Sequence, residues 1–225
     1  MILSNWALFV AIIFAFLDWA CTWKGWKIRL YIAKPATVIF LALWTFQASG
    51  WHGGMLWFGI ALLFSLAGDV FLLLRPSFFI AGMAAFFLAL VSYLIGFNQT
   101  AVAFTFPVAT TAIIVGLAAS AVLRLIRPGI ESKIKGKRFL APFFLYFTAL
   151  TLMTLSALLC LIRPEWAQPA ASLAAAGGVL FFTSDSMLSY DRFVNPIPHA
   201  RFWVHLTYHL GQLGLIAGAL LHFIP

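Results

Sequence analysis

Apolar stretches long enough to cross a lipid bilayer recur along the whole length of this chain. A transmembrane helix needs about 20 such residues to span a hydrocarbon core of ~30 Å. Hydrophobic residues make up 64% of the 225 positions, and charged residues make up only 9%. A soluble domain carries roughly 25% charged residues, so this composition excludes a water-soluble globular protein. The sequence therefore predicts an all-α integral membrane protein.

Polar breaks between the apolar runs predict a bundle of about eight transmembrane helices in a single transmembrane domain, residues 1–225. The expected helices are Leu3–Trp19, a second that follows Lys34-Pro35 and ends near Ser49, Met55–Leu74, Phe78–Phe97, Ala101–Ile126, Leu140–Ile162, Pro169–Ser189 and Phe202–Ile224. Lys34 is expected to begin the second helix, because Pro35 in a first turn loses no helical hydrogen bond.

The basic residues fall almost entirely on one side of this pattern. Of the 14 Lys and Arg residues, all but Arg163 lie in or beside connections from an odd-numbered to an even-numbered helix. Because cytoplasmic loops are enriched in Lys and Arg, these connections are expected to be cytoplasmic and both termini non-cytoplasmic. The net charge of +8 follows from this bias. It predicts contact with anionic membrane lipids and gives no reason to expect a nucleic acid partner.

Two aspartates lie inside apolar runs, where an ionisable side chain is costly and is a functional candidate by default. Asp69 comes six residues before Arg75, which places it roughly 9 Å inside the cytoplasmic boundary. Asp185 comes seven residues before Arg192, at a similar depth. The two carboxyl groups are therefore expected to meet at one level of the membrane. The alternative is two structural acids, each paired with a hydroxyl or a lysine.

The other four acids are expected near the membrane surfaces. Glu131 and Asp191 fall in predicted cytoplasmic loops and Glu165 in an outer loop, so all three are expected to be solvated. Asp18 lies at the cytoplasmic end of the first helix. It is expected to be an interfacial acid paired with Lys24.

The last helix carries a polar stripe at the same end of the bundle. Its members follow a helical spacing and are His205, Tyr208, His209 and Gln212. Gly214 and Gly218 lie on the opposite side and form a close-packing signature. A metal is not expected, because His205 and His209 have no clear third ligand. Interfacial or hydrogen-bonded histidines are the favoured interpretation.

Two further features complete the candidate site. Lys34 is the best candidate for a specific phosphate contact, whereas Arg75 and Arg192 are expected to snorkel to lipid phosphates. Asp69 and Asp185 also lie four helices apart on helices that run the same way. That relationship suggests a weak parallel four-plus-four repeat.

Four blocks of the sequence carry a family resemblance. They are Lys34-Pro35, SLAGDVFLL around Asp69, Phe79-x-x-Gly82-x-x-x-Phe86 with Tyr93, and FFTSDSMLS around Asp185 combined with Tyr208-x-x-x-Gln212. In their order and spacing they resemble the lysoplasmalogenase family of multi-spanning membrane proteins, called YhhN-like in bacteria, over nearly the whole chain. One departure is Leu90, because the family often has a histidine at that position.

The resemblance implies hydrolysis of the vinyl ether bond of lysoplasmalogens to a fatty aldehyde and a glycerophospho-alcohol. The family's two functional aspartates map onto Asp69 and Asp185. A lysophospholipid is then the expected partner, no cofactor is expected, and a bacterial plasma membrane is the expected location. The expected substrate-binding residues are Lys34 for the phosphate, Tyr208 and Gln212 for water or the glycerol, and also Tyr93 and His205.

The chemistry of vinyl ether hydrolysis is compatible with a pair of carboxyl groups. Vinyl ether hydrolysis begins with protonation of the β-carbon, and water then attacks the resulting oxocarbenium ion. Two neighbouring buried carboxyl groups do not easily both ionise, so one stays protonated as the acid while the other stabilises the cation or activates the water. Two alternatives stay open: a proton-coupled small-solute transporter, and an inactive lipid-binding protein. The oligomeric state is open as well.

Overall fold

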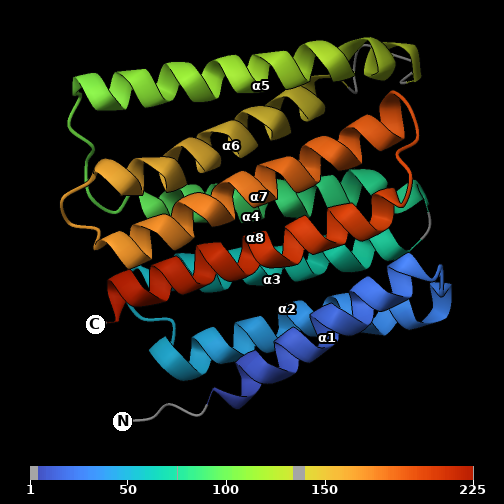
Figure 1. Ribbon diagram of the computed structural model, residues 1–225, viewed down its shortest axis with the longest axis horizontal. Helices are drawn as coiled ribbons and strands as arrows, with labels where there is room; N and C mark the ends of the chain where they lie inside the picture. The colour runs from blue at the N-terminus through green and yellow to red at the C-terminus, as the bar shows by residue number, and fades with distance from the viewer. Residues whose placement is uncertain (1–4, 75, 134–139, 225) are drawn as a thin grey trace.

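A computed structural model describes residues 5–74, 76–133 and 140–224 of the protein, without the side chains of residues 27–31 and 76 (Figure 1). Within these ranges the chain forms eight α-helices and two short 3-10 turns, Pro76–Phe78 and Cys160–Ile162. The helices are α1 Trp6–Trp23, α2 Lys27–Ser49, α3 Met55–Leu73, α4 Phe79–Phe97, α5 Phe106–Lys133, α6 Leu140–Leu159, α7 Gln168–Phe193 and α8 Ala200–Phe223. The predicted all-α membrane fold is confirmed, since seven of them are long and apolar enough to cross a bilayer.

The exception is α2, whose first third contains Lys27, Arg29 and Lys34. The prediction that this helix starts at Lys34-Pro35 is wrong, because it begins at Lys27 and Pro35 lies inside it. The basic residues suggested a loop, but the helix continues through them. Lys34 is thereby placed one to two turns inside the helix, with its side chain buried. The helix nevertheless packs along both α1 and α3.

The helices run alternately in opposite directions, so the α1–α2, α3–α4, α5–α6 and α7–α8 connections lie at one end, on the right in Figure 1. We call this the basic end, because Lys24, Lys133, Arg192 and Arg201 lie there. Other basic residues of these connections, namely Arg75, Lys135, Lys137 and Arg138, lie outside the described residues. The orientation of this end toward the cytoplasm stays a prediction.

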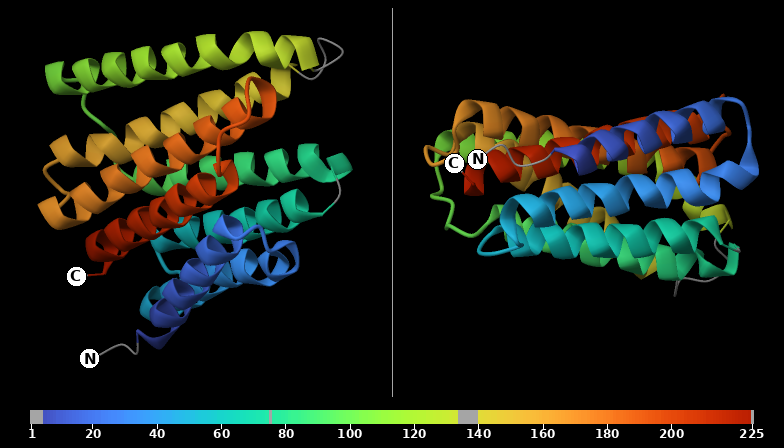
Figure 2. Two further views of the ribbon diagram at one scale, coloured as in Figure 1. Left: turned by 45° about the vertical axis from the view of Figure 1, so that its right-hand side comes forward. Right: turned by 90° about the horizontal axis from the view of Figure 1, so that it is seen from below.

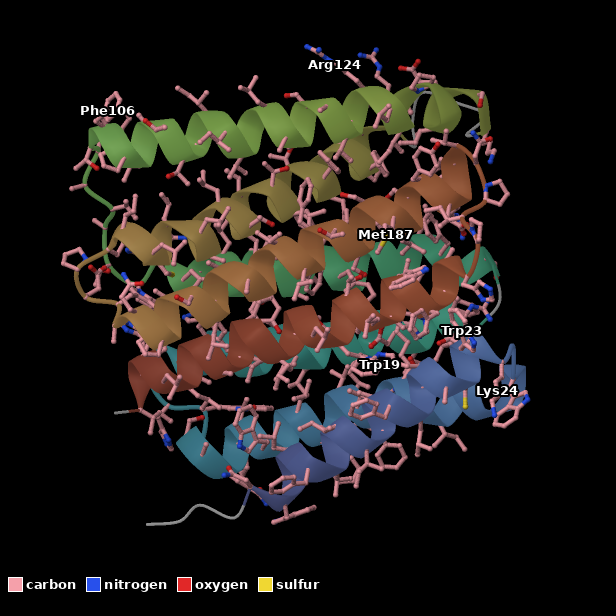
Figure 3. All side chains as sticks on the ribbon, in the orientation of Figure 1. Trp19, Trp23, Lys24, Phe106, Arg124 and Met187 are labelled. Atoms are coloured by element: carbon pink, nitrogen blue, oxygen red, sulfur yellow. The ribbon has the colours of Figure 1, made fainter. Side chains whose placement is uncertain are left out.

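The helices form two layers, with α1, α7 and α8 lying over α2, α3 and α4 (Figure 2). Helix α5 lies at one edge, where it packs against α6 and α7. It continues to Lys133, so the segment from Arg127 is helical and not a polar loop as expected. Most of its apolar side chains face outward, among them Ile113, Ile114 and Leu117, as expected for a lipid-exposed helix (Figure 3).

Helices α7 and α8 pack backbone to backbone. A Cβ atom added to Gly214 would lie 2.8 Å from the Cα of Gly177, which no real side chain tolerates without a shift. Gly218 is similarly close to Ala174. The predicted close-packing role of Gly214 and Gly218 is confirmed. This contact fixes the face of α8 that bears the polar stripe.

At the end of the bundle opposite the basic end, Arg163 links two connections between helices. Its buried guanidinium donates hydrogen bonds to the carbonyl oxygens of Phe97 and Thr100, both at 2.6 Å, and to Glu165 Oε1 at 3.0 Å. Glu165 also accepts a hydrogen bond from the Thr100 hydroxyl. Glu165 is exposed, as expected, and these hydrogen bonds are contacts that the sequence did not predict. These hydrogen bonds of Arg163 join the chain after α4 to the chain before α7.

Candidate active site

Two adjoining cavities lie at the basic end. The larger, about 470 Å³, is called the outer chamber, and its polar wall consists of Lys34, Asp191, Arg192, Arg201 and His205. The smaller, about 60 Å³, is called the inner chamber, and its polar wall includes Lys34, Tyr146, Asp185 and Tyr208. The chambers share walls from α2, α3, α4, α7 and α8: Lys34, Leu72, Phe79, Leu188, Arg192 and Val204. The rest of the inner wall is mainly apolar, with Met83, Phe86, Phe143 and Phe193.

Asp185 lies on the wall of the inner chamber, in the last third of α7. Its Oδ2 accepts a hydrogen bond from the hydroxyl of Tyr146 on α6. Sequence reasoning missed Tyr146. A tyrosine inside the apolar run of α6 was the available signal, because a buried phenol hydroxyl usually has a hydrogen-bond partner.

Asp69 is fully buried in α3 and is held by two partners. The Nζ of Lys34 lies 2.7 Å from its Oδ1, and the hydroxyl of Tyr208 donates to its Oδ2 at 2.9 Å. Lys34 also lies over the Tyr208 ring, 5.0 Å from its centroid. Lys34 and Tyr208 line the inner chamber and Asp69 is not among the described residues that do, so its carboxylate lies behind them.

A second row of hydrogen bonds fixes Tyr208. Its hydroxyl oxygen accepts a hydrogen bond from Gln212 Nε2 at 3.2 Å, while Tyr93 on α4 donates to Gln212 Oε1. Neither Tyr93 nor Gln212 lines a chamber among the described residues. A direct role for them in substrate binding stays a prediction, and their observed contacts hold Tyr208. Leu90 is fully buried three residues before Tyr93, so an apolar side chain fills that position.

Asp69 and Asp185 have separate hydrogen-bond partners but share a neighbourhood. They lie within electrostatic range of each other. Lys34 and Tyr208, which contact Asp69, line the inner chamber together with Asp185. The catalytic pairing of the two carboxyl groups stays a prediction. The geometry gives them different positions, with Asp185 on the chamber wall and Asp69 behind it.

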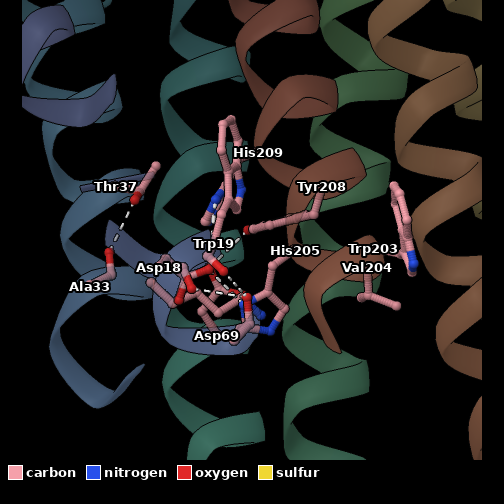
Figure 4. A network of polar contacts seen from close by, with 12 residues as sticks. Asp18, Trp19, Ala33, Thr37, Asp69, Trp203, Val204, His205, Tyr208 and His209 are labelled. Carbon is pink, nitrogen blue, oxygen red and sulfur yellow. Dashed lines mark hydrogen bonds and ion pairs between the residues drawn. The ribbon is translucent and has the colours of Figure 1, made fainter. Parts of the chain in front are cut away.

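The prediction for Asp18 is wrong. It is fully buried, and its Oδ2 lies 2.7 Å from Nδ1 of His205 and 3.9 Å from Nδ1 of His209 (Figure 4). The expected helix end at Trp19 was too early, since α1 continues to Trp23 and places Asp18 more than a turn inside. The interpretation of a hydrogen-bonded histidine is confirmed for His205 but not for His209, whose ring nitrogens make no hydrogen bond among the described residues.

The family follows from a comparison of the whole chain. The model of the YhhN family matches residues 30–219. The chain belongs to the YhhN family. The YhhN match includes both chambers, Lys34, Asp69 and Asp185, whereas Asp18 falls before it. One similar protein is lysoplasmalogenase TMEM86B of Homo sapiens, which is 28% identical over 211 residues, or 91% of this chain and 83% of that protein. No solved structure matches the chain.

Proposed function

We propose that this YhhN-family protein hydrolyses the vinyl ether bond of lysoplasmalogens, releasing a fatty aldehyde and a glycerophospho-alcohol. The observation that carries the proposal is the junction of two chemically different chambers with a carboxyl group at the inner one. A lysophospholipid has the same division between a charged headgroup and an apolar chain. The similarity to a human protein named lysoplasmalogenase supports this substrate class.

The outer chamber receives the headgroup. Lys34, Arg192 and Arg201 bring three cationic side chains to its wall, and charged donors form the strongest hydrogen bonds to phosphate oxygens. Lys34 has three N–H donors, so it can contact a phosphate while it keeps its ion pair with Asp69. The predicted phosphate contact of Lys34 thus has a structural basis.

Asp185 is the acid that protonates the β-carbon of the alkenyl group. Asp69 has an ammonium partner in Lys34, which favours its charged form. Asp185 has the neutral hydroxyl of Tyr146 as its hydrogen-bond partner and lines the chamber. Because Tyr146 occupies Oδ2, the proton for the substrate is carried on Oδ1.

Asp69 and Tyr208 stabilise the cation that follows. Protonation turns the vinyl ether into an oxocarbenium ion, and the nearby negative charge of Asp69 lowers its energy. The Tyr208 hydroxyl, held by Gln212 and Asp69, forms a fixed polar point on the inner wall. Water adds to the cationic carbon, and the resulting hemiacetal collapses to aldehyde and alcohol.

The inner chamber is too small for an alkenyl chain. A cavity volume of about 60 Å³ is more than the roughly 10–15 Å³ that one water requires, but it is far below the roughly 300–1,000 Å³ of a typical small-molecule site. The reacting carbons therefore fit, while the rest of the chain requires side chains such as Met83 and Phe143 to move aside. Both are apolar and lie on the chamber wall.

A proton-coupled transporter is the second candidate, favoured by the buried Lys34–Asp69 pair. A carrier normally places its site near the membrane midplane and opens it to both sides in turn. Both chambers described here lie at the basic end, which favours a one-sided enzyme site.

The test is aldehyde release from a lysoplasmalogen by the purified protein in detergent micelles. The ester-linked lysophospholipid with the same headgroup serves as the substrate control. Asp185→Asn and Asp69→Asn should remove turnover while the melting temperature shows that the protein is folded. Glu131→Gln on the exposed part of α5 is the matched control and should keep turnover. Wild-type protein that is folded but releases no aldehyde contradicts the proposal.

A further inference from the structure

A carboxylate–histidine pair, formed by Asp18 on α1 and His205 on α8, reaches the outer chamber. Asp18 on α1 is fully buried, and its Oδ2 contacts Nδ1 of His205 at 2.7 Å. His205 is itself buried except where it lines the outer chamber. Figure 4 shows Asp18, His205 and Asp69 gathered at one level between α1, α3 and α8. The function proposed above uses neither Asp18 nor a chamber histidine.

The contact with Asp18 determines which nitrogen of His205 is available. With Asp18 ionised, its carboxylate only accepts hydrogen bonds, so the proton of this contact is assigned to Nδ1 of His205. Nε2 is then unprotonated, and no hydrogen bond to it occurs among the described residues. A histidine held by a carboxylate in this way is a hydrogen-bond acceptor of fixed orientation.

We propose that His205, oriented by Asp18, is the general base for the water that attacks the oxocarbenium ion. The inference rests on the proposed vinyl ether hydrolysis. Asp69 is badly placed for this step, because Lys34 and Tyr208 contact its two oxygens and separate it from the chamber. His205 lines the outer chamber, which shares six wall residues with the inner chamber that holds Asp185. Water at this junction contacts the reacting carbon from the headgroup side.

The proton transfers balance over one turnover. Asp185 gives its proton to the β-carbon and becomes a carboxylate. The water oxygen bonds to the cationic carbon as its proton passes to Nε2 of His205. The hemiacetal then collapses, with the proton on His205 going to the departing glycerol oxygen and the hydroxyl proton going to Asp185. Both side chains return to their starting states, and one water is consumed.

The test separates the protonation of carbon from the attack of water. Turnover is measured in deuterated water, and the unreacted lysoplasmalogen is recovered and weighed by mass spectrometry. When water attack is slowed, the oxocarbenium ion survives long enough to rotate about the bond between its α- and β-carbons, lose the original β-hydrogen in place of the added deuterium, and return to substrate. Deuterium then accumulates at the β-carbon of the recovered lipid. A variant that was merely misfolded or bound lipid poorly would produce no such label.

We expect His205→Gln to lower turnover by about 100-fold, a typical contribution of a general base. The recovered substrate should gain one deuterium, which the wild-type reaction does not introduce. Asp18→Asn should lower turnover by about 10-fold, as expected for the partner that orients a functional histidine, with the same label. Asp185→Asn should show neither turnover nor label, because it does not protonate carbon.

His222→Gln is the matched control, since His222 lies on the same helix at the other end and stacks on Trp166. It should keep turnover within about threefold and leave the recovered lipid unlabelled. Turnover of His205→Gln near the wild-type rate overturns the inference, and so does a large loss without deuterium in the recovered lipid. If His205→Gln does not fold, Asp18→Asn decides by the same two readouts. Wild-type protein without aldehyde release refutes the proposed function itself, and the inference falls with it.

Discussion

Lys34 Nζ and Asp69 Oδ1 lie 2.7 Å apart, and their side chains are only 9% and 0% exposed. The pair joins α2 to α3 beside the inner chamber. It is a buried ion pair in a helical membrane protein, so each charge depends on the other for compensation.

Loss of the Lys34 charge should be strongly destabilising. Lys34→Met leaves the Asp69 charge unpaired, and we expect the free energy of unfolding to fall by about 3–5 kcal/mol. Lys34→Met combined with Asp69→Leu removes both charges and should recover most of that stability without recovering turnover. Thermal unfolding in detergent measures the stability of the single and the double variant, and aldehyde release measures their turnover. Arg127→Gln, which breaks an exposed pair on α5, should change almost nothing. Equal stability of the single and double variants would contradict the compensation.

We expect Tyr146 to position Asp185, the proposed acid. Tyr146→Phe removes the hydroxyl that donates to Asp185 and leaves the ring in place. We expect kcat to fall by about 10-fold with little change in KM or melting temperature, because the carboxyl group loses its fixed orientation. Tyr190→Phe on α7 is the same chemical change on the side that faces α5, and its kcat should match the wild type.

The cations of the outer chamber should act on headgroup binding. Arg201→Gln and Arg192→Gln each remove one charged donor, and we expect KM for a lysoplasmalogen to rise about 10-fold in each. Hydrolysis of an alkenyl glycerol without phosphate should be unaffected. Arg124→Gln, on the exposed face of α5, is the control. An equal effect on both substrates would contradict phosphate recognition by this chamber.

The close contact of α7 and α8 allows no added methyl group. Gly214→Ala would place a Cβ 2.8 Å from the Cα of Gly177 and 2.9 Å from the carbonyl oxygen of Leu173. We expect a loss of about 1–3 kcal/mol in unfolding free energy from the forced helix separation. Gly116→Ala on α5 meets nothing within 4 Å and should be neutral or stabilising. Gly214→Ala should therefore lower the melting temperature, whereas Gly116→Ala should leave it unchanged or raise it.

Glu165 should give a pH-dependent contribution to stability. Hydrogen bonds from its own backbone N–H, then from Thr100 and Arg163, hold the pKa of Glu165 below its ordinary value of 4.5. A carboxyl group whose pKa is lower in the folded state stabilises the fold above pH 4.5, and this contribution is lost as the pH falls through the folded pKa. Glu165→Gln should thus melt slightly below the wild type at pH 7, and the difference should disappear as the pH falls below 4.5 through the folded pKa. A constant difference across this range would contradict the assignment.

The sequence predicted much of the fold because apolar runs and charge bias report directly on a bilayer. Six of the eight expected helix starts lie within four residues of the observed ones. The start of α2 was missed because Lys27, Arg29 and Lys34 resemble a loop, although a helix at a membrane surface tolerates basic residues. The start of α5 was placed too early, at Ala101 instead of Phe106.

The candidate site was predicted where a residue type was unusual for its position. Asp69 and Asp185 stand out because carboxyl groups are rare in apolar helices. Asp18 was misjudged because its partner His205 is 187 residues away, and no local pattern reports a contact between α1 and α8. Tyr146 was missed for the same reason, because its contact with Asp185 depends on the register of α6 against α7. Depth along a helix can be estimated from sequence, but partners across helices cannot.

The division between a charged and an apolar chamber has a consequence for what happens after bond cleavage. In the proposed hydrolysis the glycerophospho-alcohol loses its only chain, so only its phosphate contacts are left at the basic end and it leaves into water. The aldehyde has lost its only charged group, so it partitions into the surrounding lipid. One product then leaves into water and the other into lipid. Neither product accumulates at Asp185, so the reverse reaction is not favoured.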